Sequence, residues 1–151
     1  MKVVSSRPVF NVLLSLMLCG LANAAETVDD VVIHKKTPDD IEYGVWGNVG
    51  VEAAPTLFML AGTIDGTLGS AYFRQCGNEL GELGYLVVSI DIPCHGTQTG
   101  EGQSVGLSGW SHRVGNGEDI VEESNARLSA VLDDLIKTGL ADPDRIAVAG
   151  T

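Results

Sequence analysis

The sequence is poor in cysteine, histidine and basic residues, and each shortage excludes a class of protein. Three cysteines and three histidines in 151 residues show no spacing typical of metal ligands, so we expect neither a metal site nor a cofactor. Nine lysines and arginines stand against 20 aspartates and glutamates, which gives a net charge of −11. Such an acidic chain argues against nucleic acids and anionic membrane surfaces as partners.

The amino terminus lacks the length of apolar chain that a membrane span requires, about 20 residues. An apolar run over residues 9–21 follows a short basic start and precedes Ala22-Asn23-Ala24, which is the pattern of a secretory signal peptide. We therefore expect residues 1–24 to be cleaved off. Residues 25–151 would then be secreted or periplasmic, without a membrane anchor. The alternatives are an uncleaved anchor and a lipoprotein acylated at Cys19.

Export permits a disulfide bond between Cys76 and Cys94, the two cysteines outside the expected signal peptide. The bond would close a loop of about 18 residues and stabilise the folded chain by about 3 kcal/mol. Nothing in the spacing requires it, so two separate half-buried thiols are the alternative.

Five runs of apolar or β-branched residues indicate strands. The runs are Val28–Ile33, Ile41–Trp46, Thr56–Ala61, Tyr85–Ile90 and Ile146–Ala149. A turn separates the first two, and Ile41, Tyr43 and Val45 alternate along the second, so the two runs predict an antiparallel hairpin. The last three runs are continuous rather than alternating, which is typical of parallel strands covered on both faces.

Two amphipathic patterns between these runs predict helices. The first spans residues 72–83 and ends before Gly84, with the apolar stripe expected to face the core. The second spans residues 118–138 and begins with acidic residues, which the helix dipole favours there. Parallel strands need such crossovers. The sequence therefore predicts an α/β fold, a three-layer sandwich with a mostly parallel sheet and an N-terminal antiparallel hairpin.

Residues 94–117 show no regular period and contain seven glycines, which predicts a long loop. Loops of this length are uncommon unless they are functional or disordered, and a loop leaving the carboxyl end of a parallel strand lies where ligands bind. Trp110, His112 and Arg113 are clustered within it and are candidate substrate-binding residues. The alternative is a glycine-rich lid tethered by Trp110 alone.

Three stretches together resemble the α/β-hydrolases, in particular esterases and the prolyl-oligopeptidase-like and dienelactone-hydrolase-like enzymes. They are Leu60-Ala61-Gly62-Thr63, Asp91-Ile92-Pro93-Cys94-His95-Gly96, and the segment from Asp142 to Thr151. In that family the last segment continues with serine, any residue and glycine. The resemblance implies that Gly150 and Thr151 are the first two positions of the G-x-S-x-G nucleophile elbow. The nucleophile, the acid and the base would then follow Thr151, and this chain would be a truncated α/β-hydrolase fold.

The resemblance also implies roles for residues within the chain. Gly62 and Thr63 would form part of the oxyanion hole, with the backbone N–H of Thr63 as donor. Ala61 stands where the family usually has a histidine, so a ring that braces this loop is missing. His95 would order its loop rather than act as the catalytic base, and Asp91 would brace a loop by hydrogen bonding.

The resulting hypothesis is a secreted or periplasmic serine hydrolase that cleaves an ester, peptide or amide bond of a small molecule through an acyl-enzyme. One alternative is an NAD(P)-binding fragment, in which Gly150 opens a G-x-G-x-x-G loop. That loop usually follows the first strand of its fold, whereas four strand patterns precede Gly150. The other alternative is an exported α/β binding domain without catalytic activity.

Overall fold

The structure is a computed structural model that describes residues 31–47, 49–50 and 52–150. The expected signal peptide, the start of the first expected strand and Thr151 lie outside the described residues. Within the described part of the chain, no helix has the length and apolar character to cross a bilayer. The same residues contain no group of three or more His, Cys, Asp or Glu side chains arranged to hold a metal ion.

A mixed sheet of five strands in the order β1-β2-β4-β3-β5 forms the centre of the molecule. The strands are β1 (Ile33–Lys36), β2 (Glu42–Gly47), β3 (Ala54–Leu60), β4 (Leu86–Ser89) and β5 (Ala141–Gly150). β1 and β2 form the expected antiparallel hairpin, and β2 also pairs antiparallel with β4. β3 is parallel to both of its neighbours, β4 and β5, as the three continuous runs predicted.

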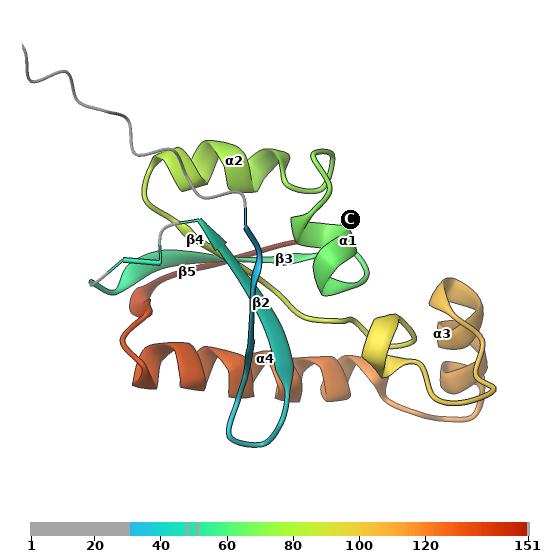
Figure 1. The fold of residues 1–151 in the computed structure, drawn as a ribbon. Helices are drawn as coiled ribbons and strands as arrows, with labels where there is room; N and C mark the ends of the chain where they lie inside the picture. Colours follow the sequence, from blue (N-terminus) through green and yellow to red (C-terminus); the bar gives the residue numbers. More distant parts are fainter. Residues whose placement is uncertain (1–30, 48, 51, 151) are drawn as a thin grey trace, which may run out of the picture.

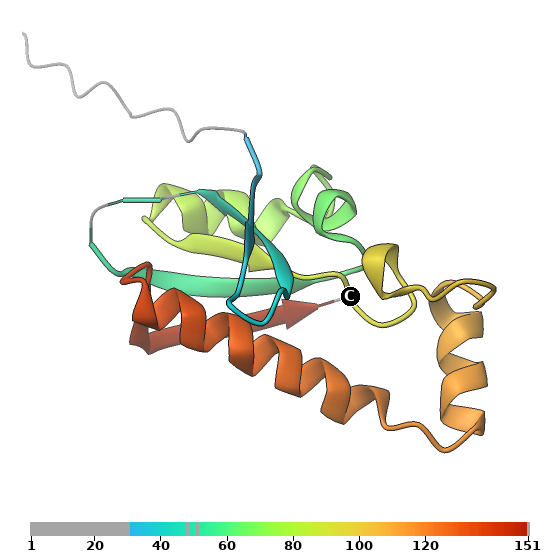
Figure 2. The same ribbon diagram turned by 60° about the horizontal axis from the view of Figure 1, so that its bottom comes forward.

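Helices cover both faces of the sheet, which confirms the expected three-layer sandwich. α1 (Ile64–Leu68) and α2 (Gln75–Glu82) lie on one face, and α4 (Ile120–Lys137) lies along the other (Figures 1 and 2). α3 (Gly106–Gly115) covers neither face and stands beyond the carboxyl ends of β3 and β4 (Figure 1). The candidate site therefore lies at this end of the sheet.

Alternate residues of the central strands supply two separate hydrophobic clusters. Phe58 and Val88 point toward α4 and pack with Val131 and Leu135. Their neighbours on the same strands point to the other face and pack with residues of α1; this second cluster comprises Trp46, Leu57, Met59, Ile64, Leu68 and Val87. Burial on both faces explains why these strands are continuously apolar in the sequence.

The first strand and the turn after it differ from the expectation. β1 begins at Ile33, where the expected strand ended, and it includes two lysines that were expected in the turn. The turn is shorter and is closed by Thr37, whose side-chain oxygen accepts the N–H of Ile41 at 3.1 Å. β-branched residues favour strands only where a partner is available, and the partners of β1 are the residues from Glu42 to Val45.

The packed face of α2 also differs from the expectation. The residues of α2 that are buried are Gly77 and Gly81, and a Cβ atom on either would lie 3.5 Å from the indole of Trp46. Tyr72 and Leu83, which were expected to face the core, are 70% and 72% exposed. The large side chain belongs to the sheet here, so α2 approaches Trp46 through its two glycines, and Leu80 of the expected stripe packs at the edge of the same cluster.

The segment expected to be a long loop contains regular structure. Gly96–Gln98 forms a single 3₁₀ turn, and α3 follows within the same segment. Glycine disfavours isolated helices by about 1 kcal/mol per residue. The glycines of this segment therefore predicted a loop where α3 forms. At Gly109 the missing side chain is what permits packing, since a Cβ atom would lie 2.8 Å from the sulfur of Cys94.

β5 begins earlier than expected because it contains a bulge. Ala141 pairs with Ala54, but the next pair joins Ile146 to Thr56, so four residues of β5 face one residue of β3. Asp142-Pro143-Asp144 lies within this bulge. It is closed by the carboxylate of Asp142, which accepts the N–H of Asp144 at 3.0 Å.

The two cysteines of the described chain are free thiols, Cys76 exposed and Cys94 buried, so the disulfide alternative is not realised. We expect iodoacetamide to alkylate Cys76 in the native protein and to alkylate Cys94 more than about 100-fold more slowly, because Cys94 reacts only when the packing against α3 opens. Peptide mass spectrometry with and without urea measures both rates. A disulfide-linked peptide, or equal native rates, would contradict this assignment.

Candidate active site

The strand register brings two of the three stretches that resemble hydrolases side by side. Leu60, the last residue of β3, pairs with Gly150, the last residue of β5. Ala61-Gly62-Thr63 follows Leu60 directly. A Cβ atom on Gly150 would lie 3.1 Å from the carbonyl oxygen of Leu60, which explains the glycine at this position. The expected oxyanion loop and the expected start of the nucleophile elbow are therefore neighbours.

The turn after β3 leaves two backbone N–H groups free. The hydroxyl of Thr63 accepts the N–H of Gly66 at 3.0 Å and caps α1, while the carbonyl of Gly62 accepts the N–H of Ile92 at 3.0 Å. Within the described residues, the N–H groups of Gly62 and Thr63 have no hydrogen-bond acceptor. Free N–H groups at such a turn are the donors that an oxyanion requires.

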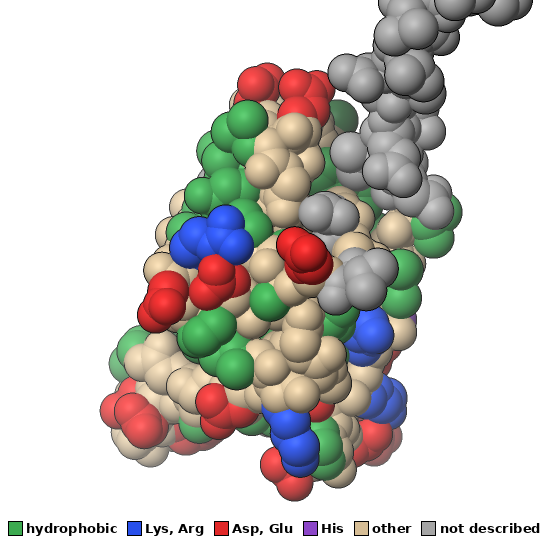
Figure 3. All heavy atoms as spheres, turned by 90° about the vertical axis from the view of Figure 1, so that its left-hand side faces the viewer, with side chains coloured by type: hydrophobic (Ala, Val, Ile, Leu, Met, Phe, Trp, Pro, Cys, Tyr) green, Lys and Arg blue, Asp and Glu red, His purple; other side chains and the backbone are tan. Residues whose placement is uncertain are grey.

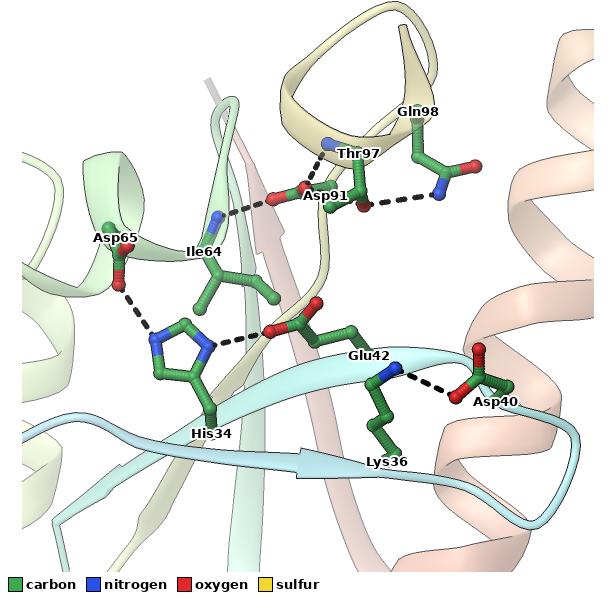
Figure 4. A network of polar contacts seen from close by, with 9 residues as sticks. All are labelled: His34, Lys36, Asp40, Glu42, Ile64, Asp65, Asp91, Thr97 and Gln98. Atoms are coloured by element: carbon green, nitrogen blue, oxygen red, sulfur yellow. Dashed lines mark hydrogen bonds and ion pairs between the residues drawn. The ribbon is translucent and has the colours of Figure 1, made fainter. Parts of the chain in front are cut away.

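Asp91 connects this turn to the segment that follows β4. Its side chain is buried and accepts three hydrogen bonds (Figure 4): from the N–H of Ile64 at 2.8 Å, and from the N–H and hydroxyl of Thr97 at 2.7 and 2.9 Å. Gly96 adopts φ +49°, and a Cβ atom there would lie 2.2 Å from the Asp91 carboxylate. Asp91 is therefore the loop brace that the sequence predicted.

His95 orders the same segment, as the resemblance implied. Its Nδ1 atom lies 2.9 Å from the carbonyl oxygen of Pro93, and the same oxygen accepts the indole N–H of Trp110 at 2.6 Å. The two rings meet edge to face with their centroids 6.2 Å apart. On its other side the imidazole lies against Gly62, where a Cβ atom would be 3.6 Å from Cδ2 of His95. The ring thus packs between the turn after β3 and α3.

The structure places the three candidate substrate-binding residues of α3 in different environments. Trp110 is directed toward Pro93, whereas His112 is exposed and contacts the amide of Asn116 at 3.2 Å. Arg113 forms ion pairs with Glu118 and Glu123. The Glu123 carboxylate, followed by that of Glu118, raises the pKa of Arg113 above its ordinary value. The described structure brings no two of the three side chains together, and their binding role stays a prediction.

A polar cavity lies on the hairpin side of the Asp91 brace. Its volume is about 330 Å³, and it is lined by Lys36, Asp40, Ile41, Glu42, Thr97, Gln98 and Arg127. Burial lowers the pKa of Arg127. None of the residues predicted from the sequence to form the active site lines this cavity, so we do not assign it to the chemistry.

Sequence reasoning missed one cluster near the site. His34 of β1 lies between Glu42 of β2 and Asp65 of α1, at 3.1 and 2.8 Å. These residues are 8 and 31 positions from His34 in the chain. No motif spacing marks such contacts, because only the docking of α1 beside the hairpin creates them.

The acidic composition does not produce a single acidic patch on the opposite end of the molecule. Figure 3 shows the end that carries the amino termini of the parallel strands, where acidic, basic and hydrophobic side chains are interspersed.

Over the part that the structure describes, the chain has the α/β-hydrolase fold. A crystal structure of a candidate acetyl xylan esterase from Bacteroides fragilis is similar, with 15% identity and a TM-score of 0.51, over 80% of this chain and 41% of that chain. A thermostable carboxylesterase cloned from a metagenomic library also matches, with 25% identity and a TM-score of 0.42, over 80% of this chain and 35% of that chain. No protein-family model matches the sequence, and no curated protein matches it.

The first of these likenesses shows the fold and nothing finer. The chain spans about two fifths of the length of that structure, since it covers 41% of it. The resemblance stated from the sequence is thereby confirmed at the level of the fold.

Proposed function

We propose that this chain is the N-terminal part of a secreted or periplasmic serine hydrolase that cleaves an ester bond, or a peptide or amide bond, in a small molecule. The observation that carries the proposal is the pairing of Leu60 with Gly150, which places a turn with free N–H groups beside the strand end that would lead into a nucleophile elbow. The fold shared with a candidate acetyl xylan esterase favours an ester. The signal-peptide pattern supports export.

In the proposed reaction, a serine directly after Thr151 attacks the carbonyl carbon of the substrate, and a histidine further along accepts its proton. The carbonyl oxygen becomes an oxyanion that accepts hydrogen bonds from the N–H of Thr63 and the N–H after the serine. Each such donor contributes about 3 kcal/mol to the transition state. The alcohol or amine then leaves with the histidine's proton, and water hydrolyses the acyl-enzyme. This chain would supply the N–H of Thr63 as one oxyanion donor, together with the sheet and loops that position it.

The full-length protein is expected to hydrolyse a short-chain nitrophenyl ester, and replacing the serine after Thr151 with alanine should lower kcat by at least about 10⁴-fold. Cys76→Ser is the matched control, because this exposed thiol is remote from the site and its loss should leave kcat unchanged. Stopped assays of both variants with equal amounts of folded protein measure the effect. Any residue other than serine after Thr151, or full activity in the alanine variant, would reject the proposal.

The dinucleotide alternative receives less support from the topology. β5 follows four other strands in the chain and lies at the edge of the described sheet, whereas a dinucleotide loop usually follows the first strand of its fold.

A further inference from the structure

His34 connects three elements of secondary structure near the candidate oxyanion loop. From β1, its Nδ1 atom contacts Oε1 of Glu42 on β2 at 3.1 Å, and its Nε2 atom contacts Oδ1 of Asp65 on α1 at 2.8 Å (Figure 4). An ionised carboxylate only accepts hydrogen bonds, and a neutral imidazole has one N–H. Both contacts are hydrogen bonds only when both ring nitrogens carry a proton, that is, in the imidazolium form.

The residues held by these contacts are consecutive with the candidate donor. Thr63 carries the N–H assigned to the oxyanion, the N–H of Ile64 is held by Asp91, and the side chain of Asp65 is held by His34. The tie through Asp91 is buried, whereas the side chains of His34 and Asp65 are 41% and 78% exposed. The inner tie is therefore shielded from solvent, and the outer one is exposed to it.

We propose that His34 is a pH-responsive positioning residue for the oxyanion loop: its imidazolium ties α1 to the β1–β2 hairpin and so holds Thr63 in place, and loss of one proton leaves a single N–H for two carboxylates and weakens this tie. The expected effect on catalysis rests on the proposed function, whereas the hydrogen bonds between His34, Glu42 and Asp65 do not. His34 touches no reacting atom and acts through Asp65.

The charged groups around His34 favour its protonated form. The hydrogen bond to Asp65, and after it that to Glu42, raises the pKa of His34 above its usual value, while partial burial opposes the rise. Lys36, on the same strand, forms its own ion pair with Asp40 at 2.7 Å. Because the pKa is raised in the folded state, both hydrogen bonds are present below about pH 6.5, and one of them is lost as the pH rises through the folded value.

The first test compares the wild-type enzyme with His34→Gln across pH at low ionic strength. We expect the ratio of the two kcat values to be about five at pH 6 and close to one at pH 9, with KM unchanged, because an exposed ionic tie contributes modestly. Asp65→Asn should reproduce the profile. Lys36→Gln is the matched control, since it removes an exposed ion pair from the same hairpin without touching α1, and its ratio should stay at one. A ratio independent of pH would overturn the positioning role.

The second test uses no activity. The amides of Ile64 and Gly66 donate to Asp91 and to the hydroxyl of Thr63. Their protection against hydrogen exchange, corrected for the intrinsic rate at each pH, should be about fivefold higher at pH 6 than at pH 9 in the wild type. His34→Gln should abolish the difference, and Lys36→Gln should keep it. If protection does not depend on His34, the proposed tie is wrong. If protection follows His34 but no ester is hydrolysed, the proposed function fails and the tie stands.

Discussion

Replacing Trp46 with alanine is expected to lower the free energy of unfolding by about 4 kcal/mol, within the range for truncation of a buried aromatic residue. Trp46 is 3% exposed and fills the space between the sheet and the glycine face of α2. Its ring also stacks under the guanidinium of Arg74, whose Cζ atom lies 4.6 Å from the ring centroid. Alanine would leave a cavity that α2 can close only by shifting, since Gly77 and Gly81 have no side chains to fill it.

The matched control for this prediction is Tyr72→Ala. Tyr72 is 70% exposed, so its removal should change the free energy of unfolding by no more than about 0.5 kcal/mol. Urea unfolding followed by fluorescence at matched protein concentration measures both variants. Similar losses for the two variants would mean that α2 packs on the sheet through its apolar stripe, as its sequence pattern alone suggests.

The second large effect is expected at Asp91. Asp91→Ala should lower the free energy of unfolding by about 3 kcal/mol, because it leaves the N–H groups of Ile64 and Thr97 without an acceptor. Asp91→Asn should cost less, since its side-chain oxygen still accepts the Ile64 N–H, although its amide group then faces the N–H of Thr97. In the full-length hydrolase, kcat should fall as well, because the brace adjoins the candidate donor at Thr63.

Asp39→Ala is the control for the Asp91 variants, because Asp39 is an exposed carboxylate in the β1–β2 turn. Its replacement should leave stability within about 0.5 kcal/mol of the wild type. Urea unfolding at pH 7 compares the three variants. If Asp91→Ala were as stable as Asp39→Ala, the three hydrogen bonds of Asp91 would not hold the two loops together.

The parts of the fold that were predictable from the sequence are those in which the pattern of a segment reflects its burial. The runs that form β3 and β4 are continuously apolar because both faces of these strands are covered. Tyr43 and Val45 alternate because their side chains point from β2 toward α4. The acidic start and apolar stripe of α4 identified that helix to within two residues of its bounds. In these segments, local pattern and tertiary environment agree.

Other segments were misjudged because the partner determines their structure. The stripe of α2 was assigned to the core, but the helix meets Trp46 at Gly77 and Gly81, and of the stripe Leu80 packs on this cluster whereas Leu83 is exposed. The glycines of α3 suggested a loop, whereas Gly109 is what allows that helix to pack on Cys94. In both helices, glycine has a low helix propensity but allows the backbone to pack closely against a neighbouring side chain. The pattern within one segment does not show which neighbour requires that glycine.

The sequence by itself determined the layered α/β class, the hairpin before the parallel strands, and the assignment of Asp91 and His95 as loop-ordering residues, since these depend on hydrophobic periodicity and on short motifs. Only the tertiary structure decided that Leu60 pairs with Gly150 and that His34 lies between Glu42 and Asp65. Register and contacts between distant segments arise when helices dock on the sheet, because side chains far apart in the chain are then brought within hydrogen-bond distance.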